Sequence, residues 1–194
     1  MPFYPDRINE HFLNPLNVGE IADAEAVGEA GSFQCGARLR LSLKIDDELK
    51  IVDARFKATG CGYLVASASA LTETLKELRV GRAAQLPRRA ITDWFEEFPA
   101  DRLQCARLCQ EALLNALQNY HNSTRAEWTG DEALICTCFG VSEKTIERVV
   151  CERTLHDVKE VTRACNAGGG CGSCHPLIVD IIEDYWRSIE ARRP

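Results

Sequence analysis

The sequence lacks the features of membrane-spanning, secreted and nucleic-acid-binding proteins. No apolar run in its 194 residues reaches the ~18 needed to cross a bilayer, and the N-terminus has no hydrophobic signal-peptide core. Positive charge is not in excess, since the formal net charge is −6, which disfavours binding to a phosphate backbone. No internal repeat or low-complexity tract is visible. We therefore expect a cytoplasmic protein that binds neither membrane nor nucleic acid.

Apolar residues and cysteine are abundant instead. Apolar residues make up 45% of the chain, and ten residues are cysteine. The apolar content is enough for the core of one medium domain or two small ones. Cysteines in this number without a secretory signal indicate a reducing compartment, where clustered thiols bind metal more often than they form disulfides.

Four cysteines near the end of the chain form a C-x-C pair and a C-x-x-C pair: Cys136, Cys138, Cys171 and Cys174. Neighbours this close rarely meet disulfide geometry without strain. Four thiolates suit a metal centre, and the spacing by itself leaves both a 2Fe–2S cluster and structural zinc open. The glycines at 168–170 would let backbone N–H groups approach the sulfurs closely.

The residues around these pairs predict short helices wrapped around one metal site. Ser142 is expected to cap a helix, Thr154 and Asp157 resemble a capping box, and His175-Pro176 is expected to open a further helix. This segment resembles bacterioferritin-associated-ferredoxin-like domains, whose C-x-C and later C-x-x-C carry a 2Fe–2S cluster. The resemblance covers about residues 134–188 and favours iron–sulfur over zinc, with a permanent 2Fe–2S cluster on the four cysteines.

Upstream of this segment, the sequence predicts a separate domain of mixed α and β structure. Apolar and polar residues alternate over 38–45 and again over 52–58, which predicts a β-hairpin. Apolar residues at helical spacing follow over 64–78 and 106–120.

The domain boundary is predicted from a segment near 121–134, which lacks either periodicity and is rich in turn-forming residues. We predict an α+β fold, with a small antiparallel sheet packed by helices over residues 1–125, a linker over 126–133 and a small all-α domain over 134–194.

Three further cysteines stand where elements of the first domain should meet: Cys35, Cys61 and Cys105. Taken singly, each is best explained as a small buried hydrophobic residue. The stretches around them are more informative, because four of them resemble the IscU-like scaffold family over roughly residues 4–121. Those stretches are Phe12-Leu-Asn-Pro-Leu-Asn-Val-Gly-Glu20, Gly31-Ser-Phe-Gln-Cys-Gly36, Ala54-Arg-Phe-Lys-Ala-Thr-Gly-Cys-Gly62 and Ala66-Ser-Ala-Ser-Ala-Leu-Thr72.

An IscU-like domain followed by a bacterioferritin-associated-ferredoxin-like domain resembles a NifU-type iron–sulfur assembly protein, a family connected with nitrogen fixation. The resemblance implies that Cys35, Cys61 and Cys105 bind a transient Fe–S cluster, iron or zinc. It also implies a cysteine desulfurase as sulfur donor and apo iron–sulfur proteins as recipients, and it is compatible with a homodimer. No turnover chemistry is expected, so we do not expect an enzyme. NifU proteins commonly end in a third, Nfu-like domain with its own C-x-x-C, which this sequence lacks.

The sequence departs from that family beside the first and third cysteines. Family members usually have Cys-Gly-Asp at the first cysteine and His-Cys at the third, where this chain has Ala37 and Gln104. These departures keep a second hypothesis open: a 2Fe–2S redox or regulatory protein whose first domain is a docking or zinc-bound module. Cys109, one helical turn after Cys105, is a candidate fourth ligand, but it also lies on an apolar helical stripe and packing is the favoured interpretation.

Overall fold

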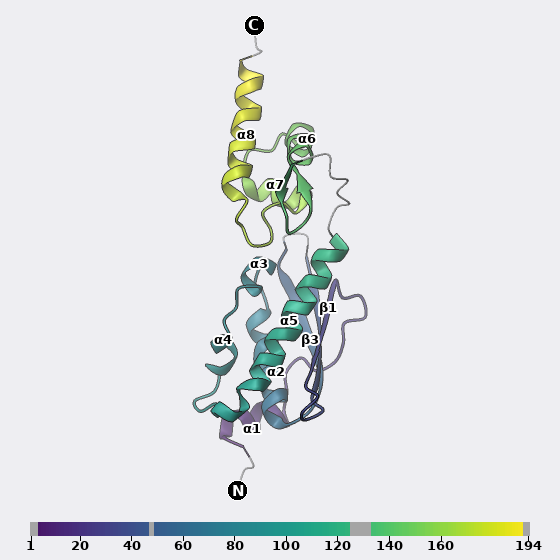
Figure 1. The fold of residues 1–194 in the computed structure, drawn as a ribbon, viewed down its shortest axis with the longest axis vertical. Helices are drawn as coiled ribbons and strands as arrows, with labels where there is room; N and C mark the ends of the chain where they lie inside the picture. Colours follow the sequence, from purple (N-terminus) through teal and green to yellow (C-terminus); the bar gives the residue numbers. More distant parts are fainter. Residues whose placement is uncertain (1–3, 47–48, 125–132, 192–194) are drawn as a thin grey trace. The chain divides into compact units, whose positions relative to one another are not determined.

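The computed structural model describes residues 4–46, 49–124 and 133–191, and the chain divides into two compact units (Figure 1). The first unit comprises residues 1–46 and 50–120, and the second comprises 47–49 and 121–194. The linker predicted at 126–133 lies outside the described residues except for its last position. Among the described residues, no helix is both long and apolar enough to cross a membrane.

The first unit is built on a three-stranded antiparallel sheet of β1 (Ala26–Gly31), β2 (Arg38–Ile45) and β3 (Ile51–Thr59), in that order. The predicted hairpin is confirmed, since β2 pairs with β3 with Leu41 opposite Phe56. Both side chains are 1% exposed, as the alternation of apolar and polar residues requires of one buried sheet face.

Helices pack around this sheet: α1 (Asp6–Leu13), α2 (Gly62–Leu75), α3 (Val80–Ala83), α4 (Arg89–Thr92), the 3₁₀ helix η1 (Ala100–Arg102) and α5 (Leu103–Thr124). α2 packs on β3 and α1, and Figure 1 shows α2 and α5 alongside the sheet. α5 approaches β1 so closely at Gly28 that a Cβ there would lie 2.1 Å from the carbonyl oxygen of Ala112. Only glycine fits at such an approach.

α5 is longer than its pattern predicts. The apolar spacing stops at Tyr120, but the helix continues to Thr124. Asn122 and Ser123 in this last turn are exposed, and the turn (His-Asn-Ser-Thr) has no apolar residue to extend the stripe. The sequence therefore placed the start of the irregular segment too early.

The second unit combines a short hairpin with helices: β4 (Leu134–Cys136), β5 (Val141–Ser142), α6 (Glu143–Arg153), α7 (Val158–Cys165) and α8 (His175–Glu190). The expected helical character is confirmed. The hairpin of β4 and β5 was not predicted, because strands of two or three residues are too short to display an alternation. The core of this unit includes Phe139, Ile146, Val150, Val161 and Ile178, each at most 1% exposed.

Two of the predicted helix starts are confirmed and the capping box is wrong. Ser142 caps α6, since its hydroxyl accepts a hydrogen bond from the Thr145 N–H at 3.3 Å, and His175 begins α8. Thr154 does not pair with Asp157 in a capping box; it ends α6 in the left-handed conformation, with φ of 55°. Asp157 itself caps α7 by accepting from the Glu160 N–H at 2.8 Å.

Candidate metal centres

Antiparallel pairing brings two of the three upstream cysteines to one end of the sheet. β1 ends at Gly31, β2 begins at Arg38 and β3 ends at Thr59, and the register makes Arg38 the partner of both other residues. The β1–β2 loop that carries Cys35 and the β3–α2 junction that carries Cys61 therefore lie at the same end of the sheet.

Cys105, in the first turn of α5, completes this group, which we call the triad. Its Sγ lies 3.7 Å from the Sγ of Cys61. Negative charge on Cys35 raises the pKa of Cys105, after the larger effects of burial and of Cys61. The structure thus gathers the three cysteines that the resemblance names as ligands, and their binding of metal stays a prediction.

The thiols of the triad differ in exposure and in proton affinity. Cys35 is exposed, and its pKa is lowered by a hydrogen bond with the Ser32 side chain and then by the Ala37 backbone. Cys105 is buried, and burial followed by the neighbouring Cys61 raises its pKa to about 12. Cys35 is therefore the readier thiolate, whereas Cys105 keeps its proton until a cation displaces it.

The residues that depart from the family lie close to this group. Ala37 is 4% exposed, and a Cβ added at Gly60 would lie 3.2 Å from the Ala37 Cβ. Position 37 is therefore adjacent to the loop that carries Cys61. Gln104 is exposed on α5. Cys109 is completely buried, and burial raises its pKa, so its place in the core favours the packing interpretation.

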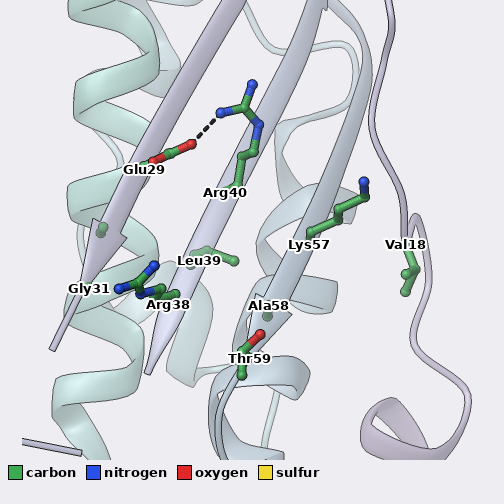
Figure 2. Close-up of a pocket in the computed structure, with 10 residues that line it drawn as sticks. Val18, Glu29, Gly31, Arg38, Leu39, Arg40, Lys57, Ala58 and Thr59 are labelled. Carbon is green, nitrogen blue, oxygen red and sulfur yellow. Dashed lines mark hydrogen bonds and ion pairs between the residues drawn. The ribbon is translucent and has the colours of Figure 1, made fainter. Parts of the chain in front are cut away.

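A charged hollow of about 680 Å³ lies on the outer face of the sheet, at the strand ends next to the triad (Figure 2). Arg38, Arg40 and Lys57 contribute its positive charge. Arg40 pairs with Glu29 and, at 3.0 Å, with Glu20, while Lys57 pairs with Glu20 at 2.7 Å. None of the described cysteines lines this hollow, so it is a charged surface beside the triad rather than part of it.

The four downstream cysteines, which we call the tetrad, line one pocket of about 200 Å³ within the second unit. Cys138 Sγ lies 3.7 Å from Cys171 Sγ, and the thiols of Cys136 and Cys174 are hydrogen-bonded to one another. Each close pair therefore joins one cysteine of the C-x-C motif to one of the C-x-x-C motif.

This arrangement fits a 2Fe–2S cluster, because each of two irons takes two thiolates. Among the described residues, no group of three or more histidine, cysteine or carboxylate side chains is spaced to hold a single metal ion. This holds for the triad as well as for the tetrad, so the triad sulfurs would have to move closer together to bind one ion. Gly170 also lies against the site, since a Cβ there would be 2.8 Å from Cys138 Sγ. The backbone thus passes within contact distance of a sulfur, as the glycine run predicted. The ligand roles of the tetrad stay a prediction.

The tetrad is electrostatically uneven. The pKa of Cys171 is lowered by the Ser173 hydroxyl first and then by the Ser173 backbone. Burial raises the pKa of Cys138, and it raises that of Cys174 to about 12. Thiolate is therefore most accessible at Cys171.

Some residues of these sites were missed by the sequence analysis. Ser173 bonds to the Cys171 sulfur at 3.2 Å, and its position inside the C-x-x-C motif was the signal that could have found it. His175 Nε2 lies 2.7 Å from the Gly168 carbonyl oxygen and so ties the glycine run to the start of α8. Ser32 beside Cys35 had no such signal, because its hydrogen bond depends on how the loop folds.

Two family models match the chain, one in each unit. Residues 3–127 match the NifU-like N terminal domain, and residues 134–184 match the BFD-like [2Fe-2S] binding domain. The first match contains the whole triad, and the second contains the whole tetrad.

Curated relatives agree with these matches. The nitrogen fixation protein NifU of Nostoc sp. is 43% identical over 190 residues, covering 93% of this chain and 63% of the relative. That of Azotobacter chroococcum mcd 1 is 35% identical over 182 residues, covering 93% and 59%. The iron–sulfur cluster assembly scaffold protein IscU of Aquifex aeolicus is 35% identical over 118 residues, covering 60% and 75%. The chain thus spans about three-fifths of the length of the two NifU relatives.

Proposed function

The chain belongs to the family of NifU-like proteins, and on that basis we propose that it is an iron–sulfur cluster assembly scaffold with a resident 2Fe–2S cluster. One observation carries the proposal: the chain has two thiol sites of opposite character. Two triad sulfurs lie 3.7 Å apart at the same end of the sheet as the exposed Cys35, and four thiols line a single pocket. The first suits cargo that must leave, and the second suits a group that must stay.

In this proposal the triad is the assembly site. Three protein thiolates leave one coordination position of the cluster open, and a ligand from a recipient protein can bind there. Cys35 is exposed and prone to be a thiolate, so it offers the first ligand to incoming iron. Cys61 and Cys105, with sulfurs 3.7 Å apart, then close on the same ion and release their protons.

The tetrad would hold the resident cluster through Cys136, Cys138, Cys171 and Cys174. When bound, that cluster supplies one-electron transfer. The chain contributes the close backbone approach at Gly170 and the Ser173 hydroxyl at 3.2 Å from a ligand sulfur. Both restrict and polarise the site, which suits a group that is retained.

The partners in this proposal follow from the chemistry. The triad contains no sulfide source, so the sulfur comes from a cysteine desulfurase, and the finished cluster passes to apo iron–sulfur proteins. In this proposal the scaffold binds a cluster and releases it to a recipient without catalysing a reaction of its own, so it is not an enzyme. Nitrogenase maturation and a homodimeric assembly are parts of the same proposal.

The test is cluster assembly on the full-length protein. Protein purified without oxygen should contain about two irons per chain, which is one 2Fe–2S cluster. Adding ferrous iron, cysteine, a cysteine desulfurase and a thiol reductant such as dithiothreitol, which reduces the persulfide sulfur to sulfide, should increase iron and acid-labile sulfide. A chelator should remove this added iron and leave the resident cluster. The added cluster should then appear in an apo-ferredoxin. If the desulfurase adds neither iron nor sulfide, the scaffold proposal is wrong.

A second candidate function is favoured by Ala37 and Gln104. Without the usual aspartate and histidine, the triad has fewer groups to exchange ligands with, which suits stable zinc binding. In that case the protein is a 2Fe–2S redox or regulatory protein whose first unit is a docking module. Zinc that remains at the triad and blocks assembly in the same experiment would establish this alternative.

A further inference from the structure

The two thiol pairs of the tetrad differ in their surroundings. Cys171 is exposed and Cys138 is half-buried, whereas Cys136 and Cys174 are only 2% and 7% exposed. The 3.7 Å separation of Cys138 Sγ and Cys171 Sγ suits two ligands of one iron, and the contact between Cys136 and Cys174 suits the other. The resident cluster of the proposed function would therefore have one iron near solvent and one inside.

The hydrogen-bond partners of the two pairs also differ. The Ser173 hydroxyl lies 3.2 Å from Cys171 Sγ, and the Ser173 N–H is directed at the same sulfur. The Cys171 N–H is directed at Cys138. At the buried pair, the sulfur of Cys174 interacts with the N–H of Gly168 and with its own N–H. In this structure the Cys171 thiol donates to the Ser173 oxygen. An iron-bound thiolate has no proton, so the Ser173 hydroxyl would then be the donor, and only the exposed pair has such a side-chain partner among these contacts.

These differences decide which iron accepts an electron more easily. Reduction adds negative charge to an iron and its thiolates, and water and hydrogen-bond donors stabilise that charge. We propose that one-electron reduction localises on the iron held by Cys138 and Cys171, and that Ser173 is the positioning residue that favours it. The electron comes from a one-electron reductant such as dithionite. It converts that ferric ion to ferrous while the other iron stays ferric, and no bond breaks.

The first test measures the midpoint potential of the resident cluster in the full-length protein. Ser173→Ala should shift the potential to more negative values, with the equilibrium constant for reduction falling roughly fivefold, the weight of one hydrogen bond. Ser173→Thr keeps the hydroxyl and should restore the potential. Thr137→Val is the matched control, because Thr137 also lines the pocket but has no hydrogen bond to a tetrad sulfur among those found here.

The proposal is overturned if Ser173→Ala leaves the potential where Thr137→Val leaves it, or if Ser173→Thr does not rescue it. A cluster that is lost from Ser173→Ala would also count against it, because the hydroxyl would then hold the fold rather than tune the iron.

The second test assigns the ferrous iron by ⁵⁷Fe Mössbauer spectroscopy of dithionite-reduced protein. Cys171→Ser should alter the ferrous signal, because an oxygen ligand then replaces sulfur on the reducible iron. Cys174→Ser should alter the ferric signal instead. The reverse pattern would overturn the assignment, and the potential measurement decides the matter if either variant loses its cluster.

This inference depends on the resident cluster, and its failure can be told apart from failure of the proposed function. A colourless second unit that binds zinc would refute both. A coloured protein that assembles and transfers clusters, but whose midpoint potential is unchanged by Ser173→Ala, would refute only the assignment of the reduced iron.

Discussion

The first unit leaves two of its three triad thiols outside its core, Cys105 being the buried one, whereas the second unit buries two of its four tetrad thiols. Leu41, Phe56 and Leu71 in the core of the first unit are each 1% exposed, whereas Cys35 is exposed. In the second unit, Cys136 and Cys174 are buried alongside residues such as Phe139. The same ligand type is thus an addition to a finished fold in one unit and part of the fold in the other.

The comparison predicts its largest effect in the second unit. Cys138→Ala should abolish the visible absorption of the resident cluster in the full-length protein. It should also lower the helical circular dichroism of the second unit, because the close thiol pairs join the β4–β5 hairpin to the segment before α8 and metal binding there adds to the free energy of folding. Cys151→Ala, an exposed thiol on α6, is the matched control and should change neither signal. A colourless but fully folded Cys138→Ala protein would show that the second unit does not depend on its metal.

The matching change in the first unit should leave its fold intact. A variant with Cys35→Ala, Cys61→Ala and Cys105→Ala should lose the desulfurase-dependent iron and keep the colour of the second unit. Its free energy of unfolding should fall by about 1–2 kcal/mol, because Cys105 alone of the three is buried. Chemical denaturation and iron counts check this. Equal iron uptake by parent and variant would show that the three thiols are structural.

Alkylation rates sharpen the contrast within the first unit. In metal-free protein at neutral pH, iodoacetamide should modify Cys35 at least about tenfold faster than Cys105, since one pKa unit changes the thiolate fraction by about that factor. The lowered pKa of Cys35 means that its reactivity persists as the pH falls, to a lower pH than for a free cysteine.

Peptide mapping by mass spectrometry measures both rates. Ser32→Ala removes the hydrogen bond that is the main cause of the lowered pKa, so the alkylation of Cys35 should require a higher pH than in the parent. Equal labelling of Cys35 and Cys105 would contradict the difference in exposure.

The smallest effect is expected at position 37. Ala37→Asp should speed cluster transfer to an apo-acceptor several-fold, because a carboxylate next to the Cys61 loop can compete with thiolate for iron. Ala37→Asn has the same shape without the charge and should change the rate less. Loss of the scaffold's visible circular dichroism on adding acceptor follows the transfer. Identical rates for the parent and both variants would show that position 37 does not control release.

Local patterns predicted much of the fold. They failed where an element was too short to show a pattern or contained no apolar residue. β2 and β3 were predicted because the alternation over 38–45 and 52–58 is a local signal of a sheet with one buried face. The hairpin of β4 and β5 is too short to alternate, and the last turn of α5 contains no apolar residue that would mark it as helical. At Thr154, the side chain type suited a cap, but the backbone had already turned left-handed to end α6.

The sequence alone specifies which residues are thiols, how the C-x-C and C-x-x-C motifs are spaced, and which predicted strands have a buried face. How those thiols meet depends on tertiary packing. Cys138 pairs with Cys171 across 33 positions and Cys61 with Cys105 across 44. The bond from Ser173 to a sulfur, and the exposure of Cys35 beside the burial of Cys105, were decided there too. The reason is physical: a contact between distant residues depends on how whole elements pack, whereas motif spacing and strand alternation depend only on neighbouring residues along the chain.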